Sequence, residues 1–249
     1  MINIYDLHKS FGDTQVLAGT NLHIKSNEVI VIIGQSGCGK SVLLKLIMGL
    51  LKPDKGHIEI FGKDITNLNG QELRRIQQKT GMLFQQAALF DSLTVGENVG
   101  FFLYENTALD KESIREIVAE KLDMVGLSGT EGLKPASLSG GMRKRVGLAR
   151  AIAYNPEIIL YDEPTTGIDP VMGAAIDRLI KKLQEELSHT AVVVTHDMAS
   201  AYRIADRIAM LHQGKIIALG TPEQIRESKD PIVRQFVRGE AEGPLTKAG

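Results

Sequence analysis

This sequence is short of several features, and each shortage excludes a class of protein. Only one cysteine, Cys38, occurs in 249 residues, which rules out an intrachain disulfide and suits a reducing compartment. The 29 lysine and arginine residues are balanced by 30 aspartate and glutamate residues, for a net charge of −1. Without a basic field that attracts phosphate backbones, we expect no nucleic-acid partner. The basic run Arg143 to Arg145 is interpreted as a solvated helix face.

Long apolar runs are also missing. No uncharged segment approaches the roughly 18–20 residues that are needed to span a bilayer. Met1 to Asp6 lacks the basic region and long apolar core of a secretory signal, so we expect none there. If the protein works at a membrane, we therefore expect another chain to carry it there. The composition, with 43% hydrophobic and 24% charged residues, is that of an ordinary globular protein.

Strand-like and helix-like patterns alternate along the chain, which predicts an α/β fold. Residues from about 90 to 155 are mostly helical with polar breaks, so this stretch is interpreted as an insertion into the core. Beyond the alternating N-terminal strands, the expected strands are Val29–Ile33, His57–Phe61, Gly81–Phe84, Ile158–Tyr161, Ala191–Thr195, Arg207–Leu211 and Lys215–Leu219. The expected helices are one from Lys40, then Asn69–Lys79, Val95–Tyr104, Lys111–Val125, Gly141–Tyr154, Met172–Leu187 and Met198–Ile204, followed after Asp230 by a short amphipathic piece and a loose polar tail.

The most informative segment is Gly34 to Ser41, which reads Gly-Gln-Ser-Gly-Cys-Gly-Lys-Ser and lies between an apolar strand and a helical pattern. Its glycines allow backbone N–H groups to curl around phosphate oxygens, and the helix N-terminus adds partial positive charge. Lys40 can reach the β- and γ-phosphates, while the Ser41 hydroxyl suits a Mg²⁺ ligand. The alternative is an ordinary glycine-rich turn between a strand and a helix.

Polar residues follow two other apolar strands. Asp162 and Glu163 end the run Ile158 to Tyr161, and His196 ends the run Val192 to Thr195. Because ligands bind beyond the carboxyl ends of strands in an α/β sheet, Asp162 is a candidate Mg²⁺ ligand and Glu163 a candidate base for an attacking water. His196 can donate a hydrogen bond to a γ-phosphate or to that water. The alternative for the two acids is a strand that ends in solvated carboxylates, and the alternative for His196 is a structural histidine.

A second candidate anion site lies far along the chain, at Ser139, Gly140 and Gly141. Ser139 is a plausible N-cap of the helix that follows, and the two glycines leave backbone N–H groups open to an anion. By itself this segment is only a capped helix start. A second anion site is unusual in a nucleotide-binding protein that acts as a monomer.

Taken together, the chain resembles the ATP-binding subunit of an ABC transporter, from Met1 to about residue 230 and with every motif in order. The matching motifs are the Walker A loop Gly34–Ser41, the Q-loop residue Gln85, the signature Leu138–Gly141, the Walker B acids Asp162 and Glu163, the D-loop residue Asp169, the switch histidine His196 and the adenine-stacking aromatic Phe11.

The resemblance implies a P-loop NTPase core of the ABC ATPase type, with an N-terminal antiparallel β subdomain and an inserted helical subdomain. It places the ATP-binding domain at residues 1–230, with a core of about 1–90 and 156–230, a helical subdomain of about 91–155, and a tail at 231–249 as a candidate dimer contact.

The resemblance also implies Mg²⁺-dependent ATP hydrolysis. The implied catalytic residues are Glu163, His196 and Gln85, and the implied Mg²⁺ ligands are Ser41, Gln85 and Asp162. The implied nucleotide contacts are Phe11, Val16, Gly34, Gln35, Ser36, Gly37, Cys38, Gly39, Lys40, Ser41, Val42, Ser139, Gly140, Gly141 and Asp169.

In this family two copies form a head-to-tail dimer, and the resemblance implies that Ser139 and Gly141 of one copy close over ATP in the other copy's Walker A loop. This arrangement gives the second anion site a purpose. Gln85 would report nucleotide occupancy to an integral-membrane permease. The apolar segment from Leu89 to Leu93, with Phe101 and Phe102, is either a groove for a permease helix or internal packing of the helical subdomain.

Met142 departs from the commonest family pattern, which has glutamine at this position. With Gln85 to Leu93 and the tail Asp230 to Phe236, this variant is similar to the Mla-type subfamily, which powers phospholipid movement between the inner and outer membranes of diderm bacteria. The similarity implies a peripheral protein at the cytoplasmic face of the inner membrane. Its partners would be a second ATPase copy, a permease, a lipid-carrying substrate-binding protein and a small STAS-type regulator.

Three other functions are weighed against this one. An ATPase of an importer for another small solute would share every catalytic residue, but Met142 and the tail argue against it. A soluble ABC ATPase of DNA repair or translation needs a long coiled-coil insertion or tandem cassettes, and the chain has neither. A nucleotide-binding scaffold that no longer hydrolyses ATP is disfavoured by the presence of Glu163 and His196.

Overall fold

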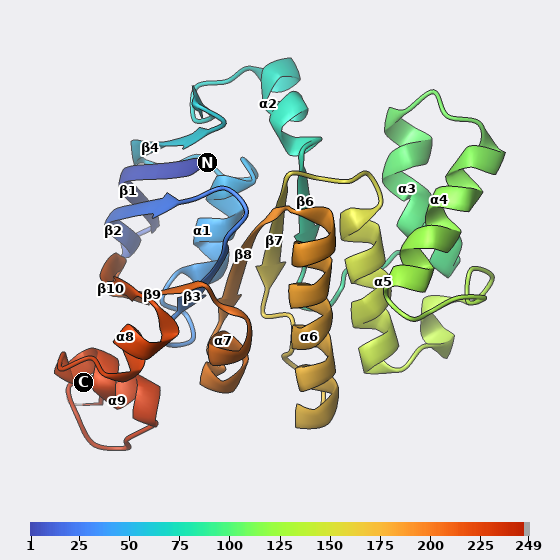
Figure 1. Cartoon of the computed structure of the whole chain (residues 1–249). Coiled ribbons are helices and arrows are strands. Elements are labelled where there is room, and N and C mark those ends of the chain that lie inside the picture. The colour runs from blue at the N-terminus through green and yellow to red at the C-terminus, as the bar shows by residue number, and fades with distance from the viewer. Residues whose placement is uncertain (247–249) are drawn as a thin grey trace. The chain divides into compact units, whose positions relative to one another are not determined.

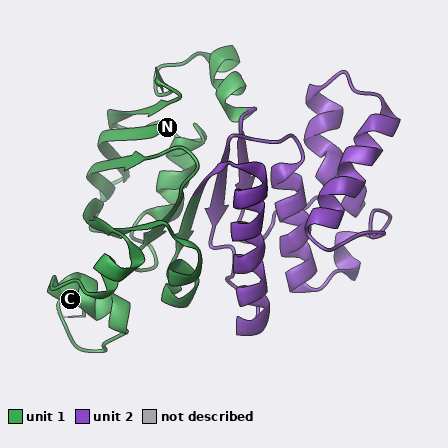
Figure 2. Cartoon of the chain, viewed as in Figure 1, with its two compact units in different colours: residues 1–77, 192–249 green, residues 78–191 purple. Residues whose placement is uncertain are grey.

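The computed structural model describes residues 1–246, which fall into two compact units (Figure 2). The first unit joins residues 1–77 to the chain from residue 192 onward, and the second unit contains residues 78–191. Of the described residues, no helix combines the length and the apolar character that crossing a membrane requires.

The first unit begins with an antiparallel sheet, whose strand order is β2-β1-β4-β5 (Figure 1). Alternation in β1 buries Ile2, Ile4 and Leu7 on one face, as period-two patterning predicts. The strands are β1 (Ile2–Phe11), β2 (Thr14–Ile24), β4 (Lys55–Ile60) and β5 (Lys63–Asp64). The N-terminal antiparallel β subdomain expected from the sequence is thereby confirmed.

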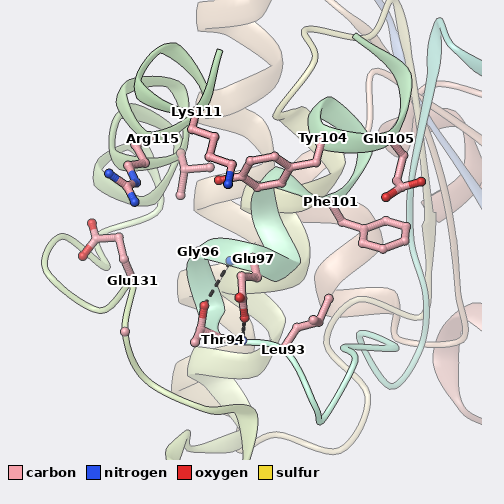
Figure 3. Close-up of a pocket in the computed structure, with 12 residues that line it drawn as sticks. Leu93, Thr94, Gly96, Glu97, Phe101, Tyr104, Glu105, Lys111, Arg115 and Glu131 are labelled. Carbon is pink, nitrogen blue, oxygen red and sulfur yellow. Dashed lines mark hydrogen bonds between the residues drawn. The ribbon is translucent and has the colours of Figure 1, made fainter. Parts of the chain in front are cut away.

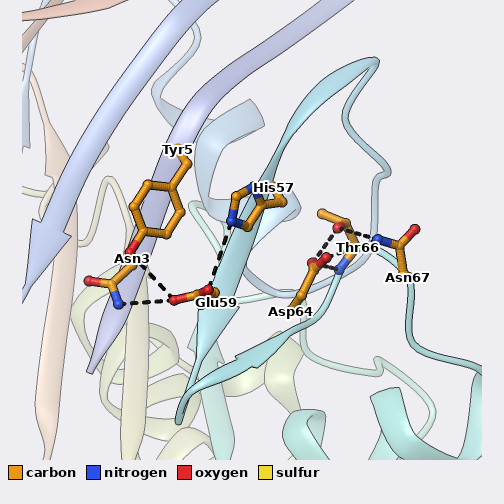
Figure 4. Close-up of polar contacts among 7 residues, drawn as sticks. All are labelled: Asn3, Tyr5, His57, Glu59, Asp64, Thr66 and Asn67. Atoms are coloured by element: carbon orange, nitrogen blue, oxygen red, sulfur yellow. Dashed lines mark hydrogen bonds and ion pairs between the residues drawn. The ribbon is translucent and has the colours of Figure 1, made fainter.

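Polar side chains of β1 and β4 contact one another across this sheet (Figure 4). The Glu59 carboxylate accepts hydrogen bonds from Asn3 Nδ2 at 3.3 Å and from the Tyr5 hydroxyl at 3.5 Å. The ring of Tyr5 stacks on His57, with 4.7 Å between the ring centroids. Cross-strand pairs of this kind fix the register of an antiparallel sheet.

The first unit also contains the strand run β10-β9-β3-β8, in which β3 pairs with β9 in parallel and β9 pairs with β10 as an antiparallel hairpin. All five residues of β3 are buried, as its uniformly apolar sequence predicts. The strands are β3 (Val29–Ile33), β8 (Thr190–Thr195, with its first two residues in the second unit), β9 (Arg207–His212) and β10 (Lys215–Gly220). The helices of this unit are α1 (Lys40–Ile47), α2 (Gly70–Gln77), α7 (Met198–Ile204), α8 (Pro222–Arg226) and α9 (Pro231–Arg238).

The second unit pairs two parallel strands, β6 and β7, with Leu83 opposite Tyr161. The helix α5 contacts α3, α4, α6 and β6. The elements are β6 (Thr80–Leu83), α3 (Val95–Asn106), α4 (Lys111–Met124), a single 3₁₀ turn (Pro135–Ser137), α5 (Gly140–Ile152), β7 (Ile158–Asp162) and α6 (Pro170–Leu187). The helices α3 and α4 belong to the stretch that the sequence marks as an insertion, while the domain boundaries proposed from the sequence stay a prediction.

The segment after α9 is held in place by a buried glutamine. Gln235 is 3% exposed; its Nε2 donates to the carbonyl of Glu240 at 3.1 Å, and its Oε1 accepts from the amide of Leu245 at 2.7 Å. The expectation of a loose tail therefore does not hold for residues 240–246. Residues 247–249 lie outside the described part of the chain.

Candidate functional site

The loop between β3 and α1 has the geometry of a phosphate cradle. Gly39 is the N-cap of α1 and adopts the left-handed conformation, with φ of 105°, which an L side chain would strain. Gln35, Ser36 and Gly37 are exposed at the tip of the loop. A Cβ atom at Gly34 would overlap the carbonyl oxygen of Leu211, which explains why only glycine fits there.

The start of α1 differs from those of the helices α3 to α9. In each of those helices the side chain of the N-cap residue accepts a hydrogen bond from a backbone amide of the first turn. Within the described residues, no side-chain hydrogen bond of this kind caps α1. The capping residues of α3 to α9 are Thr94, Asp110, Ser139, Asp169, Asp197, Thr221 and Asp230. The start of α1 thus has no capping side chain at its N-cap residue, Gly39, and helix N-termini of this kind are suited to bind anions.

Lys40 lies folded back along the loop. It is 6% exposed, and its Nζ donates to the carbonyl oxygens of Gly34 at 2.8 Å and Gln35 at 3.0 Å. Ser41 and Val42 follow in the first turn of α1 and are half-buried. An ammonium group and a hydroxyl at the mouth of an amide-lined loop form a donor set that fits a triphosphate with its Mg²⁺ ion.

A pocket of about 340 Å³ opens beside this loop. Val16, which the sequence predicted as a nucleotide contact, lines it, and Phe11 is not among its lining residues. Phe11 lies at the end of β1, is 48% exposed, and has Lys9 Nζ 5.5 Å from its ring centroid. The pocket is lined by Thr14–Val16, Gln35–Cys38, His212–Gly214, Pro244 and Leu245. The last five residues were not expected from the sequence, because the fold alone brings the β9–β10 turn and the C-terminal segment here.

His196 also belongs to the first unit, where it is exposed and directly follows β8. The next residue, Asp197, caps α7 by accepting from the Ala199 amide at 2.8 Å, and its own amide donates to Thr195 Oγ1 at 3.0 Å. These contacts fix the chain on the C-terminal side of His196.

The second unit holds the two predicted acids at the end of β7. Asp162 is the last residue of the strand and is 6% exposed, and Glu163 is 7% exposed. Glu163 has a φ of 49°, which is uncommon for a residue that is not glycine. Its carboxylate accepts a hydrogen bond from the Thr166 hydroxyl at 3.0 Å. Nothing in the sequence pointed to Thr166.

Three other predicted motifs meet in the second unit, around a pocket of about 300 Å³. Gln86 and Ala87, directly after Gln85, line it together with Gly140 of the signature and Ile168 beside Asp169. Its remaining lining residues are Arg143, Lys144, Thr166 and Gly167. Gln85 and Ser139 are exposed, so both side chains are accessible to a ligand or a partner.

Ser139 and Asp169 each cap a helix. The Ser139 hydroxyl accepts from the amide of Met142 at 3.2 Å, as predicted for the start of α5. Asp169 accepts from the amides of Val171 and Met172, both at 3.0 Å, and so fixes the start of α6. Buried Gly141 lies against α6, because a Cβ atom there would be 2.9 Å from Met172 Cε.

The basic run Arg143 to Arg145 is not a solvated face. Arg143 is exposed, but Lys144 is 5% exposed, and Arg145 is half-buried and donates to the carbonyl of Val125 at 3.1 Å. Helical spacing could have revealed this, since Lys144 shares the face of α5 that carries the apolar residues Leu148 and Ala151.

A pocket of about 630 Å³ lies in the helical part of the second unit, at the surface of α3 and α4 (Figure 3). Phe101 and Tyr104 line it and are 39% and 41% exposed. Phe102, by contrast, stacks on Tyr154 with 4.1 Å between the ring centroids. Phe102 therefore packs internally and Phe101 faces the pocket, while the groove for a permease helix stays a prediction.

Comparison with known proteins agrees with these motifs. The family model described as ABC transporter matches residues 17–166. An intermembrane phospholipid transport system ATP-binding protein, MlaF of Haemophilus influenzae, is 44% identical over 98% of this chain and 93% of its own length. A probable ribonucleotide transport ATP-binding protein, mkl of Mycobacterium leprae, is 43% identical over 98% of this chain and 70% of its own length.

A solved structure is similar over most of the fold. A dimeric ATP-binding cassette in a post-hydrolysis state, bound to ADP and Pi, has a TM-score of 0.82 and 38% identity, and covers 89% of this chain and 99% of its own. The α/β fold with the core and insertion expected from the sequence is thereby confirmed. This chain belongs to the ABC transporter family and is one of its ATP-hydrolysing cassettes.

Proposed function

We propose that this protein is the ATPase subunit of a transporter that moves phospholipid between the inner and outer membranes of a diderm bacterium. The observation that carries the ATPase part is the phosphate-cradle geometry of the loop before α1, with left-handed Gly39 and with buried Lys40 Nζ bound to the carbonyls of Gly34 and Gln35. The lipid part rests on similarity to MlaF across nearly the full length of both chains, together with Met142 and the α9 segment.

In this proposal the chain's residues divide the chemistry between them. The amides of Gly34 to Gly39 and the Lys40 ammonium bind the phosphates, and Ser41, Asp162 and Gln85 hold Mg²⁺, which offsets charge on the phosphates. Glu163 accepts a proton from the attacking water, and His196 donates a hydrogen bond to the γ-phosphate. The Thr166 hydroxyl orients the Glu163 carboxylate by donating a 3.0 Å hydrogen bond to it. Phe11 and Val16 contact the adenine.

Two copies of the chain are proposed to form a head-to-tail dimer around two nucleotides. Exposed Ser139 at the start of α5 supports this, because a hydroxyl at a helix N-terminus suits a phosphate held by another copy. Asp169 belongs to the same contact in this proposal, and the tail from residue 231 adds a second one. ATP binding would draw the copies together, and hydrolysis with phosphate release would part them.

The proposed partners in the membrane follow from the same assignment. A permease helix would dock at the 630 Å³ pocket of α3 and α4, where aromatic Phe101 and Tyr104 lie among Glu97, Glu105, Lys111 and Arg115. A lipid-carrying substrate-binding protein and a STAS-type regulator would complete the complex. The ATPase would then be a peripheral protein at the cytoplasmic face of the inner membrane.

Purification of the native complex from membranes tests the cargo. We expect mass spectrometry to find a permease and a lipid-carrying protein with bound phospholipid, and the reconstituted complex to move labelled phospholipid in the presence of ATP. A complex that carries Lys40→Ala should assemble but fail to move lipid, which controls for passive exchange. A complex that instead holds a binding protein for a hydrophilic solute, with no lipid movement, would favour the small-solute importer.

A further inference from the structure

Lys144 is a buried cation that contacts two of the catalytic motifs. It lies in the second turn of α5 and is 5% exposed. Its Nζ donates to the carbonyl oxygen of Gln85 at 2.5 Å and to that of Glu163 at 3.3 Å. Burial lowers the pKa of Lys144, while the nearby charges of Asp162 and Glu163 oppose that shift. An ammonium group is costly to bury, so these contacts offset a substantial desolvation penalty.

Glu163 needs such support because its backbone is strained. A φ of 49° places it in the left-handed region, which strains any residue that carries a side chain. Its carbonyl accepts from both Lys144 Nζ and the amide of Thr166 at 3.2 Å. Its carboxylate accepts from the Thr166 hydroxyl at 3.0 Å. Thr166 therefore binds both the main chain and the side chain of Glu163, and Lys144 adds a second donor to the main-chain carbonyl.

The other carbonyl oxygen that Lys144 binds, that of Gln85, lies just before a second strained segment. Ala87 and Ala88, which follow Gln85 closely, have φ values of 59° and 46°. Arg150, two turns further along α5, donates to their carbonyl oxygens at 2.5 Å and 2.7 Å. One helix thus holds the main chain of Gln85 to Ala88 through two cations.

We propose that Lys144 is a positioning residue for ATP hydrolysis, whose ammonium group holds the main chain of Glu163 and of Gln85 in the conformation that catalysis requires. Because Ser139 caps the start of α5, Lys144 also links the signature to both of these motifs within one protomer. This inference rests on the proposed function, since it takes Glu163 as the base. It assigns no contact with ATP to Lys144 itself.

Replacement of Lys144 by methionine is the direct test. We expect Lys144→Met to lower kcat about 10- to 100-fold and to leave KM for ATP within about threefold, because a misplaced base slows chemistry without removing phosphate contacts. Lys144→Arg, which keeps a cationic donor, should recover most of kcat. Lys121→Met is the matched control: Lys121 is 3% exposed in the same unit, but its ammonium meets Glu120. That variant should keep the kcat of the unaltered protein.

A double mutant separates positioning from simple destabilisation. If Lys144 acts partly through Glu163, adding Lys144→Met to Glu163→Gln should slow turnover by less than the single Lys144→Met change does in the unaltered protein, whereas independent losses that multiply would overturn the inference. An unaltered kcat in Lys144→Met, beside an inactive Glu163→Gln, would also overturn it and leave the proposed function standing. Unaltered turnover in Glu163→Gln would instead reject the base and the proposed function.

If methionine at position 144 prevents folding, as the melting curve would reveal, Lys144→Gln and Lys144→Arg are compared instead. A higher kcat for the arginine variant at equal KM supports the inference. Equal kcat values for the two variants contradict it.

Discussion

Glu163→Gln is expected to bind MgATP with unaltered affinity and to hydrolyse it about 10²- to 10⁴-fold more slowly than the unaltered protein. The amide keeps the shape of the carboxylate and can still accept the Thr166 hydroxyl, which donates to Glu163 at 3.0 Å. It cannot accept a proton from the attacking water. Loss of turnover with retained binding is therefore the expected result, measured by phosphate release and by equilibrium binding of a fluorescent ATP analogue.

Glu157→Gln is the control for this change. Glu157 directly precedes β7, at the opposite end of the strand, and forms an exposed ion pair with Lys79 at 2.7 Å. Because exposed ion pairs contribute little to stability, this variant should hydrolyse ATP at the unaltered rate. Equal turnover in Glu163→Gln and Glu157→Gln would reject Glu163 as the base.

Lys40→Ala is expected to weaken ATP binding about 10- to 100-fold, since hydrogen bonds to charged groups contribute about 1.5–3 kcal/mol. In the described structure Lys40 Nζ donates hydrogen bonds to the carbonyl oxygens of Gly34 and Gln35. When ATP binds, the ammonium group can exchange these carbonyl oxygens for phosphate oxygens. Truncation removes the only charged donor in the phosphate loop sequence. The measurement is ATP affinity by isothermal titration calorimetry.

Lys45→Ala serves as its matched control, because Lys45 is exposed in the last turn of the same helix and does not face the loop. Its affinity for ATP should not change. If Lys40→Ala binds ATP as tightly as Lys45→Ala does, the phosphate-binding role of the loop is wrong.

The sequence predicted the strand and helix order well because its signals are local. Val29 to Ile33 is apolar throughout and is buried throughout, and the left-handed glycine at position 39 lies where the phosphate-loop pattern requires one. Ser139 was predicted as an N-cap from the residues beside it, and the structure has that cap. Each of these predictions depends only on residues close together in the chain.

The contacts that join distant segments could not be predicted in the same way. Lys144 was interpreted as solvated because a short basic run usually forms a solvated helix face. In the structure its ammonium group instead donates hydrogen bonds to two carbonyl oxygens, from residues 59 and 19 positions away in the chain. Leu245 reaches the pocket beside Gly37 because Gln235 holds the chain after α9. Local composition carries no signal for such long-range partners.

The central claim is that each triphosphate is enclosed by two protomers, one supplying the Walker A loop and the other the signature. We would purify a dimer of two differently tagged copies, both carrying Glu163→Gln, with Lys40→Ala in one copy and Ser139→Arg in the other. Only a site shared between copies combines an intact loop with an intact signature, so we expect the mixed dimer to retain trapped ATP and neither uniform dimer to do so. A mixed dimer that traps no more ATP than the uniform dimers would contradict the claim.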